Sequence, residues 1–578
     1  MEEILTASLP FPTARERPGR PERILLVFPP FWPPLIPPMG LATLKGRLRA
    51  EGFSAVTAID LNTVDVFQTY QRDYYTALGR WIPKANLGVV GKLGFVVLQN
   101  HLLAWINSNG NMKTVSRAVG EFVSLVFYVD AHQNLLTELN GIVSKFSVEM
   151  LRKFKELLDD YQPDVLGLSV PGLAPLAAAK IALDAFKTQF PEGLAIVGGS
   201  IFLSGLAESP DFERFLALTS RADNIIVGDG IDIFLGAIDG KERLDRILFA
   251  VPPGNGPVTK SRVPNPDYTD FDMSRYPYVG TEQTISCPFG CAFCNLPRYH
   301  GKYQKRPTEQ IADELLLLYR LYGSQLIYMA DSILNPIIRD LAADLRQLDV
   351  PLYIDGYLRS QEGLGNQDLA LDLRRGGLYR ARIGVESGSQ RVLDLMDKRI
   401  TVKQSSETVR ALAAAGIKTT IYLVVGYPGE TDADFQATLE WIDELQNDIW
   451  QVDCNAFEYW YSGQCKDDEW ARLRMPLYSA DVGEILPVRG WTLNCEPLRK
   501  DAYARLSRLV SFCEERGIVD PHDMRSIHQA DARWQRLHAN AVPPLIEFQR
   551  RRTVVECRDA ELLVRAPVAN QEMDAFMF

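Results

Sequence analysis

Short apolar runs alternate with helical patterns along the first part of the chain. The run 24–28 ends at two prolines, and Leu41, Leu44 and Leu48 then recur with helical spacing. A second helical pattern covers 173–186. Further short apolar runs occupy 55–61, 164–170, 194–197 and 224–227. Strands that alternate with helices predict a parallel, doubly wound, Rossmann-like α/β sheet, in which ligands bind at the carboxyl ends of the strands.

A second series of the same kind begins near residue 280. Pro307 opens a helical pattern in which Ile311, Leu315 and Leu318 share one face, and Gly323 ends it. Similar helical stretches separate the predicted strands, which are 281–286, 325–330, 352–358, 380–385, 419–425 and 450–457. Six such units predict a partial (β/α)6 barrel, whose chemistry lies where the strands end and the loops begin.

These patterns divide the chain into five segments. An irregular leader covers 1–22, the α/β domain covers 23–250, and a proline- and glycine-rich linker covers 251–279. The barrel covers 280–465, and a mostly helical C-terminal region, expected to cap the substrate, covers 466–578.

An insertion at about 63–150 interrupts the α/β domain. Its apolar stretch 87–106 is barely long enough to span a membrane, and Lys92, Asn100 and His101 interrupt it. We therefore interpret this stretch as a buried helix and expect no membrane contact.

Composition narrows the functional classes. Of 578 residues, 46% are hydrophobic and 23% are charged, which is typical of a soluble globular protein. The net charge of −11 provides no general attraction for phosphates, so we expect no nucleic-acid partner. The first residues show no basic run before an apolar one, and eight cysteines are too few for a disulfide framework. We therefore expect a protein of the reducing cytoplasm.

Three of the cysteines crowd together immediately after a predicted strand. Cys287, Cys291 and Cys294 follow at spacings of four and three, and Gly290 permits a tight loop. Thiolates are soft ligands that suit zinc or iron–sulfur clusters. A structural zinc site or an electron-transfer cluster normally has four protein ligands, so three leave one metal position free. The alternative is a closed site whose fourth ligand is His300 or a distant cysteine.

This CxxxCxxC motif at the start of a βα series resembles the radical S-adenosylmethionine (SAM) superfamily. The resemblance implies that Cys287, Cys291 and Cys294 hold a [4Fe-4S] cluster, while SAM chelates the fourth iron. Phe293 matches the aromatic residue that lies beside the adenine in that superfamily. No catalytic residue beyond the cluster ligands is predicted, because abstraction of hydrogen from carbon needs no general base.

Further strand ends match the superfamily in the same order along the chain. The resemblance implies SAM contacts from Phe293, Ala330, Asp331, Arg382, Glu386, Ser387, Val425 and Gly426. A carboxylate such as Glu386 can accept hydrogen bonds from ribose hydroxyls, and Arg382 can pair with the methionine carboxylate. Three alternatives remain open: Asp331 caps a helix from Ser332 onward, Arg382 and Glu386 form a mutual salt bridge, and the glycine segment at 426–429 is a plain turn.

Short segments at the strand ends of the α/β domain carry a second resemblance. Phe28-Pro29-Pro30, the segment 37–44 and the glycine-rich strand ends are similar to the cobalamin-binding domain that precedes many radical SAM cores. The resemblance implies cobalamin contacts from Pro38, Leu41, Ser169, Val170, Gly198, Gly199, Ser200, Gly228, Asp229 and Gly230. The alternative is a nucleotide-binding or purely structural α/β domain.

One motif of many cobalamin proteins is missing. No Asp-x-His-x-x-Gly occurs, and His101 and His132 lie in the insertion rather than after a strand. A cobalamin held here would therefore lack the familiar histidine lower ligand, which favours a reduced, nucleophilic cobalt.

Together the motifs resemble the class B, cobalamin (B12)-dependent radical SAM methyltransferases. The resemblance implies a [4Fe-4S] cluster, SAM and methylcobalamin as cofactors. It also implies a 5′-deoxyadenosyl radical that abstracts hydrogen from an unactivated carbon of a small-molecule substrate, to which methylcobalamin then gives a methyl group. An electron donor such as flavodoxin or ferredoxin is expected.

Aromatic residues are candidates for the substrate pocket. Tyr459, Trp460 and Tyr461 extend from the last predicted strand, and Tyr299 follows the cysteines. The alternative is that such rings are core residues or lie exposed to solvent.

Other functions also remain open. The same cofactors serve ring contraction, cyclisation or rearrangement without methyl transfer, and phosphorus methylation. A non-catalytic iron–sulfur or corrinoid carrier is a further alternative. The substrate and its stereochemistry, the electron donor and the oligomeric state are not predicted.

Overall fold

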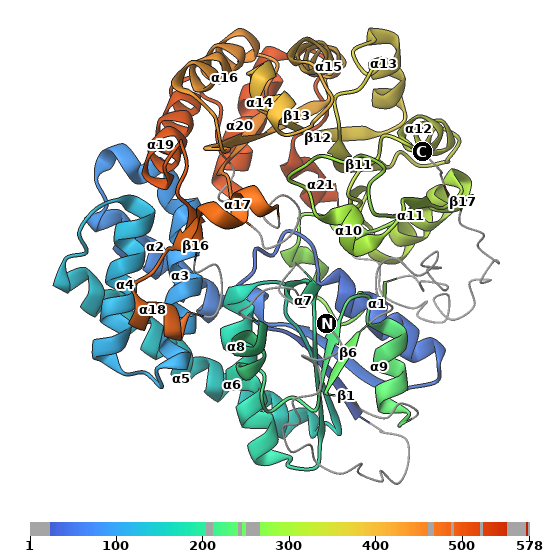
Figure 1. The fold of residues 1–578 in the computed structure, drawn as a ribbon. Helices are drawn as coiled ribbons and strands as arrows, with labels where there is room; N and C mark the ends of the chain where they lie inside the picture. Colours follow the sequence, from blue (N-terminus) through green and yellow to red (C-terminus); the bar gives the residue numbers. More distant parts are fainter. Residues whose placement is uncertain are drawn as a thin grey trace.

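The computed structural model places most of the chain. The described residues are 23–203, 212–240, 246–249, 266–459, 467–486, 491–520, 524–551 and 574–575. The predicted leader 1–22, the predicted linker before residue 266, Trp460 and Tyr461 lie outside the described residues. The chain folds around two parallel six-stranded sheets, which occupy the lower and upper halves of Figure 1.

The first sheet has the strand order β2-β1-β3-β4-β5-β6. Its strands are β1 (Arg23–Phe28), β2 (Ala55–Asp60), β3 (Val165–Ser169), β4 (Leu194–Gly198), β5 (Asn224–Val227) and β6 (Ile247–Phe249). The helices that follow them include α1 (Met39–Ala50), α6 (Leu173–Gln189), α7 (Ser200–Leu203), α8 (Phe212–Ala217) and α9 (Ile231–Ile238). The strand order reverses where β1 pairs with both β2 and β3, and ligands of such sheets bind at this switch point. The doubly wound prediction is confirmed, and β6 is an additional strand.

The insertion consists of four long helices after β2. They are α2 (Asp65–Trp81), α3 (Val90–Asn107), α4 (Met112–Phe127) and α5 (Gln133–Tyr161), so it extends beyond the predicted end at 150. The predicted buried helix is α3, on which Val97, Leu103 and Ala104 are fully buried. In the described parts of the chain, no helix is both long and apolar enough to cross a membrane.

The second sheet has the order β14-β13-β12-β11-β10-β7, with all neighbours parallel. Its strands are β7 (Val279–Thr281), β10 (Leu326–Met329), β11 (Tyr353–Leu358), β12 (Leu378–Glu386), β13 (Lys418–Val425) and β14 (Gln451–Ala456). The connecting helices are α11 (Thr308–Tyr322), α12 (Ile338–Leu345), α13 (Gln367–Arg375), α14 (Gln390–Leu395), α15 (Val402–Ala414) and α16 (Asp432–Leu445). This arrangement confirms the predicted partial barrel.

The predicted first barrel strand, 281–286, is in fact broken in two. β7 ends at Thr281, and β8 (Thr284–Ile285) pairs antiparallel with β9 (Gln304–Lys305) outside the barrel sheet. The buried Asp331 carboxylate accepts hydrogen bonds from the backbone N–H groups of Gln283 (2.9 Å) and Thr284 (2.5 Å). These two bonds hold the chain where it leaves the barrel, so the cysteines follow β8 rather than a barrel strand.

The described end of the predicted linker packs tightly between the two sheets. Lys45 of α1 is fully buried and lies 2.7 Å from Asp270 Oδ2 and 3.4 Å from Asp267 Oδ1. The Tyr276 hydroxyl donates to the Asp60 carboxylate over 2.7 Å. These buried polar contacts fix the approach of the chain to β7.

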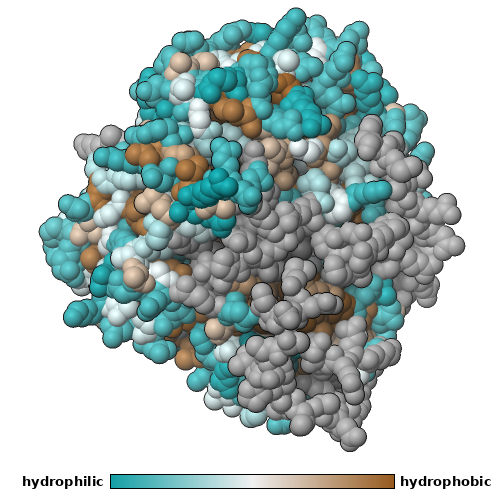
Figure 2. Space-filling model, viewed as in Figure 1, coloured by the Kyte–Doolittle hydropathy of each residue, from teal (hydrophilic) through white to brown (hydrophobic). Residues whose placement is uncertain are grey.

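The C-terminal region is mostly helical, as predicted. It contains α17 (Asp468–Leu473), β15 (Arg474–Pro476), α18 (Ala480–Ile485), β16 (Trp491–Leu493), α19 (Arg499–Glu515), α20 (Met524–Leu537) and α21 (Leu545–Arg551). Figure 1 shows α18 and α19 beside the insertion helices α2–α5. Ser479 donates to the Glu121 carboxylate through its backbone N–H and its hydroxyl, both over 2.6 Å. The surface over these helices is mainly hydrophilic in Figure 2, since their apolar sides face inward.

A partly buried ion cluster joins the insertion to the edge of the barrel. Lys92 Nζ on α3 lies 2.5 Å from Asp453 Oδ1 on β14 and 3.4 Å from Asp520 Oδ2. It also donates to the Cys454 carbonyl over 2.6 Å. Burial opposes the charge on Lys92, but the two carboxylates outweigh this effect and raise its pKa. The insertion therefore braces β14.

Candidate functional site

The three cysteines lie on the loop between β8 and the short helix α10 (Leu296–His300), and all are partly exposed. The Cys294 N–H donates to the Cys291 carbonyl over 3.0 Å, which closes a tight turn. Ser286 opens the loop with a φ of +67°, a conformation that is uncommon outside glycine. Its hydroxyl donates to the Gly301 carbonyl over 2.7 Å. Figure 1 shows α10 on the side of the barrel that faces the first sheet.

The three thiols are a donor set that an iron–sulfur cluster can use. Burial raises the pKa of Cys287 and of Cys294, so a metal must displace their protons when it binds. Within the described ranges, no three His, Cys, Asp or Glu side chains converge as one metal ion would require. In a cluster, by contrast, each thiolate binds a different iron. The donor set therefore suits a cluster held by three protein thiolates.

A buried arginine that no sequence pattern signals touches the cysteine loop. Arg359 directly follows β11 and is 8% exposed. Its Nη1 lies 3.2 Å from Cys291 Sγ, and its guanidinium carbon lies 4.3 Å from the centroid of the Phe289 ring. Its Nη2 donates to the Lys398 carbonyl. The end of β11 therefore places a cation against the candidate cluster.

The chain after α14 ties the cysteine loop to the end of β12. The Ala292 N–H donates to the Met396 carbonyl over 2.9 Å. Lys398 Nζ lies 2.5 Å from Glu386 Oε1 and 5.5 Å from the Phe293 ring centroid. Glu386 has a φ of +69°, and non-glycine residues in this region concentrate at functional sites. Two residues predicted from the sequence, Phe293 and Glu386, are thus brought together by Lys398, which was not predicted.

Arg382 pairs with a different carboxylate from the one expected. Its Nε and Nη2 lie 2.6 and 2.8 Å from the two carboxylate oxygens of Asp355. Its Nη1 donates to the Tyr422 hydroxyl over 3.2 Å, and its guanidinium carbon lies 4.9 Å from the Tyr328 ring centroid. The alternative of a salt bridge between Arg382 and Glu386 is therefore wrong. A contact between Arg382 and the methionine carboxylate stays a prediction. The Arg382 guanidinium already has a carboxylate partner in Asp355.

Asp331 and Ala330 shape the entry to the cysteine loop. The Ala330 N–H donates to the Thr281 carbonyl over 2.7 Å. The alternative that Asp331 caps a helix from Ser332 is wrong, because the next helix begins at Ile338. Burial raises the pKa of Asp331 to about 6 although backbone N–H groups bind its carboxylate. A contact between Asp331 and SAM stays a prediction.

The remaining residues predicted to bind SAM have contacts within the protein. The Ser387 hydroxyl lies 3.1 Å from the Thr438 hydroxyl, and Val425 is 1% exposed. Gly426 has a φ of +78°, and a Cβ there would lie 2.2 Å from Cβ of Ala502 on α19. Glycine is thus required at this position by the approach of α19, and the SAM contacts of these residues remain a prediction.

Aromatic rings after β14 form a half-buried cluster that reaches the same loop. The Tyr459 ring centroid lies 5.2 Å from that of Phe457 and 5.7 Å from that of Trp491. Phe457 lies 4.8 Å from Tyr427, and Phe293 packs against the group that contains Tyr427. These rings connect the C-terminal region with the residue expected beside adenine.

The other aromatic candidates differ in their surroundings. Trp450, which directly precedes β14 and was not among the candidates, is 1% exposed and donates its indole N–H to Asp531 over 3.1 Å, so it belongs to the core. Trp460, Tyr461 and the side chain of Tyr299 lie outside the described residues. A substrate contact by Tyr459 stays a prediction.

The residues predicted to contact cobalamin lie along the carboxyl edge of the first sheet. They occupy the start of α1 (Pro38, Leu41) and the ends of β3, β4 and β5 (Ser169, Val170, Gly198, Gly199, Ser200, Gly228, Asp229, Gly230). Gly199 has a φ of +125°, and a Cβ there would lie 2.3 Å from the Val170 carbonyl oxygen. The loop from β1 to α1 adds Trp32 and Leu35, which are 39% and 42% exposed. Small residues and exposed apolar side chains at the switch point fit a broad, flat ligand.

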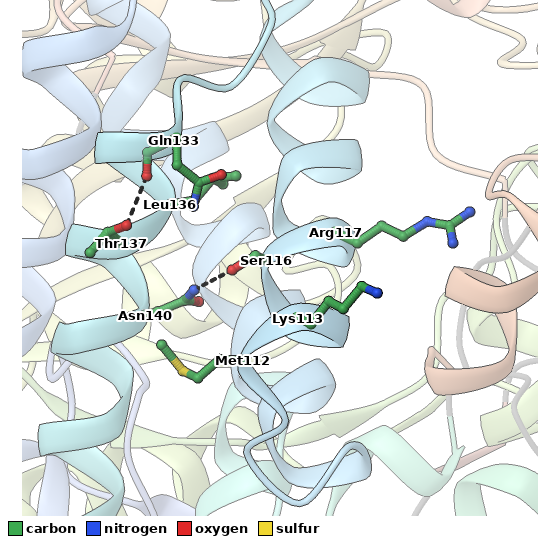
Figure 3. Close-up of a pocket in the computed structure, with 8 residues that line it drawn as sticks. All are labelled: Met112, Lys113, Ser116, Arg117, Gln133, Leu136, Thr137 and Asn140. Carbon is green, nitrogen blue, oxygen red and sulfur yellow. Dashed lines mark hydrogen bonds between the residues drawn. The ribbon is translucent and has the colours of Figure 1, made fainter.

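A surface cavity lies elsewhere on the molecule. It has a volume of about 490 Å³ and is lined by residues of α4 and α5, among them Met112, Arg117 and Asn140. Figure 3 shows Asn140 of α5 donating to Ser116 of α4, whereas Arg117 extends from α4 away from α5. The cavity contains none of the residues predicted from the sequence.

Comparison with known sequences identifies the barrel. Residues 282–442 match the family model of the radical SAM superfamily. An uncharacterized methyltransferase of Pyrococcus horikoshii is 25% identical over 324 residues, which cover 51% of this chain and 67% of that protein. The anaerobic magnesium-protoporphyrin IX monomethyl ester cyclase of Rubrivivax gelatinosus is 23% identical over 354 residues. That match covers 56% of this chain and 60% of the cyclase, less than two thirds of its length.

Solved structures share the fold of both halves. TsrM of Kitasatospora setae, a radical SAM methyltransferase solved with cobalamin and a [4Fe-4S] cluster, aligns with a TM-score of 0.56 at 16% identity. The alignment covers 92% of this chain and 98% of TsrM. The cobalamin-dependent radical SAM enzyme OxsB, with aqua-cobalamin bound, aligns with a TM-score of 0.50 at 14% identity over 92% of this chain and 80% of OxsB. Residues 282–442 are therefore a radical SAM domain, and the chain as a whole shares the fold of the radical SAM methyltransferase TsrM.

Proposed function

We propose that this protein is a cobalamin-dependent radical SAM methyltransferase that methylates an unactivated carbon of a small molecule. The observation that carries the proposal is the cysteine loop. Three partly exposed thiols lie on it, at spacings of four and three, inside the segment that matches the superfamily. Three thiolates leave one iron of a [4Fe-4S] cluster open to SAM.

The residues around the loop supply the contacts that such cofactors need. Cys287, Cys291 and Cys294 would bind the cluster, and Phe293 would lie beside SAM. Lys398 and Glu386, held 2.5 Å apart, offer a cation and a carboxylate to the polar groups of SAM. When bound, the cluster and SAM supply hydrogen abstraction from carbon, and methylcobalamin supplies a methyl group.

The edge of the first sheet would hold the corrin. Its glycines leave the backbone accessible, and Trp32 and Leu35 offer apolar surface for a macrocycle. Figure 1 places this edge, near α7, on the same side as α10 of the barrel. A corrin at this edge would thus lie on the side of the molecule that carries the cluster.

The substrate would enter beside the aromatic cluster of Tyr459, Phe457 and Trp491. Half-buried rings supply apolar area for a small molecule while keeping an edge open to it. We propose a cytoplasmic location and a small one-electron donor protein, because a thiolate-bound cluster requires a reducing environment.

Anaerobic reconstitution with iron, sulfide and cobalamin tests the function. With SAM, a reductant and a substrate library, we expect 5′-deoxyadenosine and S-adenosylhomocysteine in equal amounts, together with a product heavier by one methylene unit. Absence of both nucleosides from a preparation that holds cluster and corrinoid would contradict the proposal. A product methylated on phosphorus would contradict the choice of carbon.

A second candidate is cyclisation or rearrangement without methyl transfer. It is supported by the cyclase of Rubrivivax gelatinosus, whose matched segment covers 56% of this chain. This reaction predicts 5′-deoxyadenosine without S-adenosylhomocysteine and no added methyl group. The ratio of the two nucleosides therefore separates the candidates, and cleavage of no SAM would favour a carrier.

A further inference from the structure

Arg359 is a buried cation without a carboxylate partner among the described residues. Its guanidinium contacts the Cys291 thiol, the Phe289 ring and the Lys398 carbonyl. Asp397, in the adjacent segment of the chain, pairs directly with Arg399 at 2.8 Å; Arg359 only helps to lower its pKa through space and makes no direct contact with it. Burying an unpaired charge is costly, and proteins normally compensate it with an anion. The position therefore calls for a negative group that is bound rather than supplied by a side-chain carboxylate.

The atom that Arg359 touches indicates which anion this is. Its Nη1 lies 3.2 Å from Cys291 Sγ, the atom that binds iron under the proposed function. A cluster held by three thiolates is anionic, and its negative charge increases by one when it accepts an electron. A nearby N–H donor and positive charge stabilise the reduced form more than the oxidised form.

We propose that Arg359 is a positioning residue that donates a hydrogen bond to the cluster-bound Cys291 thiolate and raises the reduction potential of the cluster. This inference rests on the proposed function. Arg359 is held for this role on two sides, by the Lys398 carbonyl and by the Phe289 ring, so its planar fork stays directed at the sulfur.

The neighbouring cations provide a matched comparison. Lys398 is neutralised by Glu386 at 2.5 Å, so its field at the cluster is weakened. Arg399 has a side chain that is 72% exposed, and it pairs with Asp397. Solvent screens such an exposed charge. Arg399→Gln therefore removes a positive charge next to Lys398, the residue whose carbonyl Arg359 contacts, but without loss of a contact to sulfur.

The test is a redox titration of the reconstituted full-length protein without SAM, followed by electron paramagnetic resonance of the reduced cluster. We expect the midpoint potential to fall in the order wild type, Arg359→Lys, Arg359→Gln, with Arg399→Gln close to wild type. In Arg359→Gln the ratio of reduced to oxidised cluster at a fixed potential should fall at least tenfold, which is about 59 mV for one electron. If Arg359→Gln fails to hold a cluster, the midpoint potential of Arg359→Lys is compared with that of wild type. Lysine keeps the positive charge but cannot donate to the Cys291 sulfur and the Lys398 carbonyl from two separate nitrogens.

Several outcomes would overturn the inference. One is a midpoint potential that changes no more in the Arg359 variants that hold a cluster than it does in Arg399→Gln. Another is an unchanged potential with weakened SAM binding, measured by isothermal titration, which would assign Arg359 to the methionine carboxylate instead. A wild-type protein that forms no [4Fe-4S] cluster would instead refute the proposed function itself.

Discussion

The two parallel sheets present contrasting carboxyl edges. Along the first, the predicted contact residues are glycines and other small or apolar residues, and Asp229 is the only charged one. Along the second, charged groups are buried: Asp331, Arg359, Glu386 and Lys398 are each at most 8% exposed. Two parallel sheets of the same kind thus have different carboxyl edges: the first offers backbone groups and apolar surface, and the second carries buried charged side chains.

This difference teaches how each edge would bind its ligand. A glycine-rich edge offers backbone groups and area, which suits a large, flat molecule held by many weak contacts. Buried charges must be fixed by partners in advance, as Lys398 is by Glu386, which suits a small, charged ligand held in one orientation. The proposed division places cobalamin at the first edge and the cluster with SAM at the second.

The largest expected effect is loss of the cluster at the second edge without any change in corrinoid binding at the first edge. Cys291→Ala removes one of three thiolates, so we expect loss of the cluster and of 5′-deoxyadenosine formation while corrinoid uptake stays intact. Iron content, nucleoside products and the corrinoid absorption spectrum measure these quantities. Cys495→Ala, which removes a partly exposed cysteine outside the loop, is the control and should keep all three. Loss of corrinoid binding in Cys291→Ala would contradict the separation.

The next largest effect concerns the ion cluster of Lys92, Asp453 and Asp520, which joins the insertion to the barrel. Lys92→Met leaves the buried Asp520 carboxylate and the partly exposed Asp453 carboxylate without their shared cation, and we expect a loss of about 3 kcal/mol in the free energy of unfolding. Urea denaturation monitored by circular dichroism measures it. Lys153→Met removes a lysine whose ion pair with Glu156 is exposed, and it should change stability little. Equal stability of the two variants would show that the brace contributes nothing.

The smallest effect tests the backbone of the first edge. At Gly199 the left-handed backbone and the Val170 carbonyl oxygen leave no room for a Cβ, so Gly199→Ala should cost about 1–3 kcal/mol and weaken corrinoid binding. Gly141→Ala on α5 meets no atom within 4 Å and should stabilise by about 0.5–1 kcal/mol. Thermal unfolding and corrinoid titration measure both variants. Unchanged corrinoid affinity in Gly199→Ala would remove this edge from the cobalamin site.

Much of the fold was predictable because both sheets are parallel and buried on both faces. Apolar runs such as 24–28 and 419–425 then coincide with strands, and the helices between them show regular apolar spacing. The first barrel strand was predicted wrongly, because the residue that ends it, Asp331, lies almost 50 positions later in the chain. Its bonds to Gln283 and Thr284 leave no local signal.

The candidate site shows the same limit. The cysteine spacing, Phe293 and Glu386 could be recognised as local motifs, whereas Arg359 and Lys398 lie in no motif that the sequence displays. Arg382 looked available to SAM in the sequence, yet Asp355 binds it bidentately in the barrel interior. Pairing of charges is a property of neighbours in space, so motif reading could not assign these partners.

The sequence by itself determined the order of strands and helices, the three-thiol loop and the glycine-rich strand ends, because each depends on residues close together in the chain. Only the tertiary structure decided which charges meet at the strand ends, where Arg359 contacts Cys291 across 68 positions. It also decided that the insertion braces the barrel through Lys92. Such contacts join residues far apart in the chain, and their energies depend on burial, which no local pattern records.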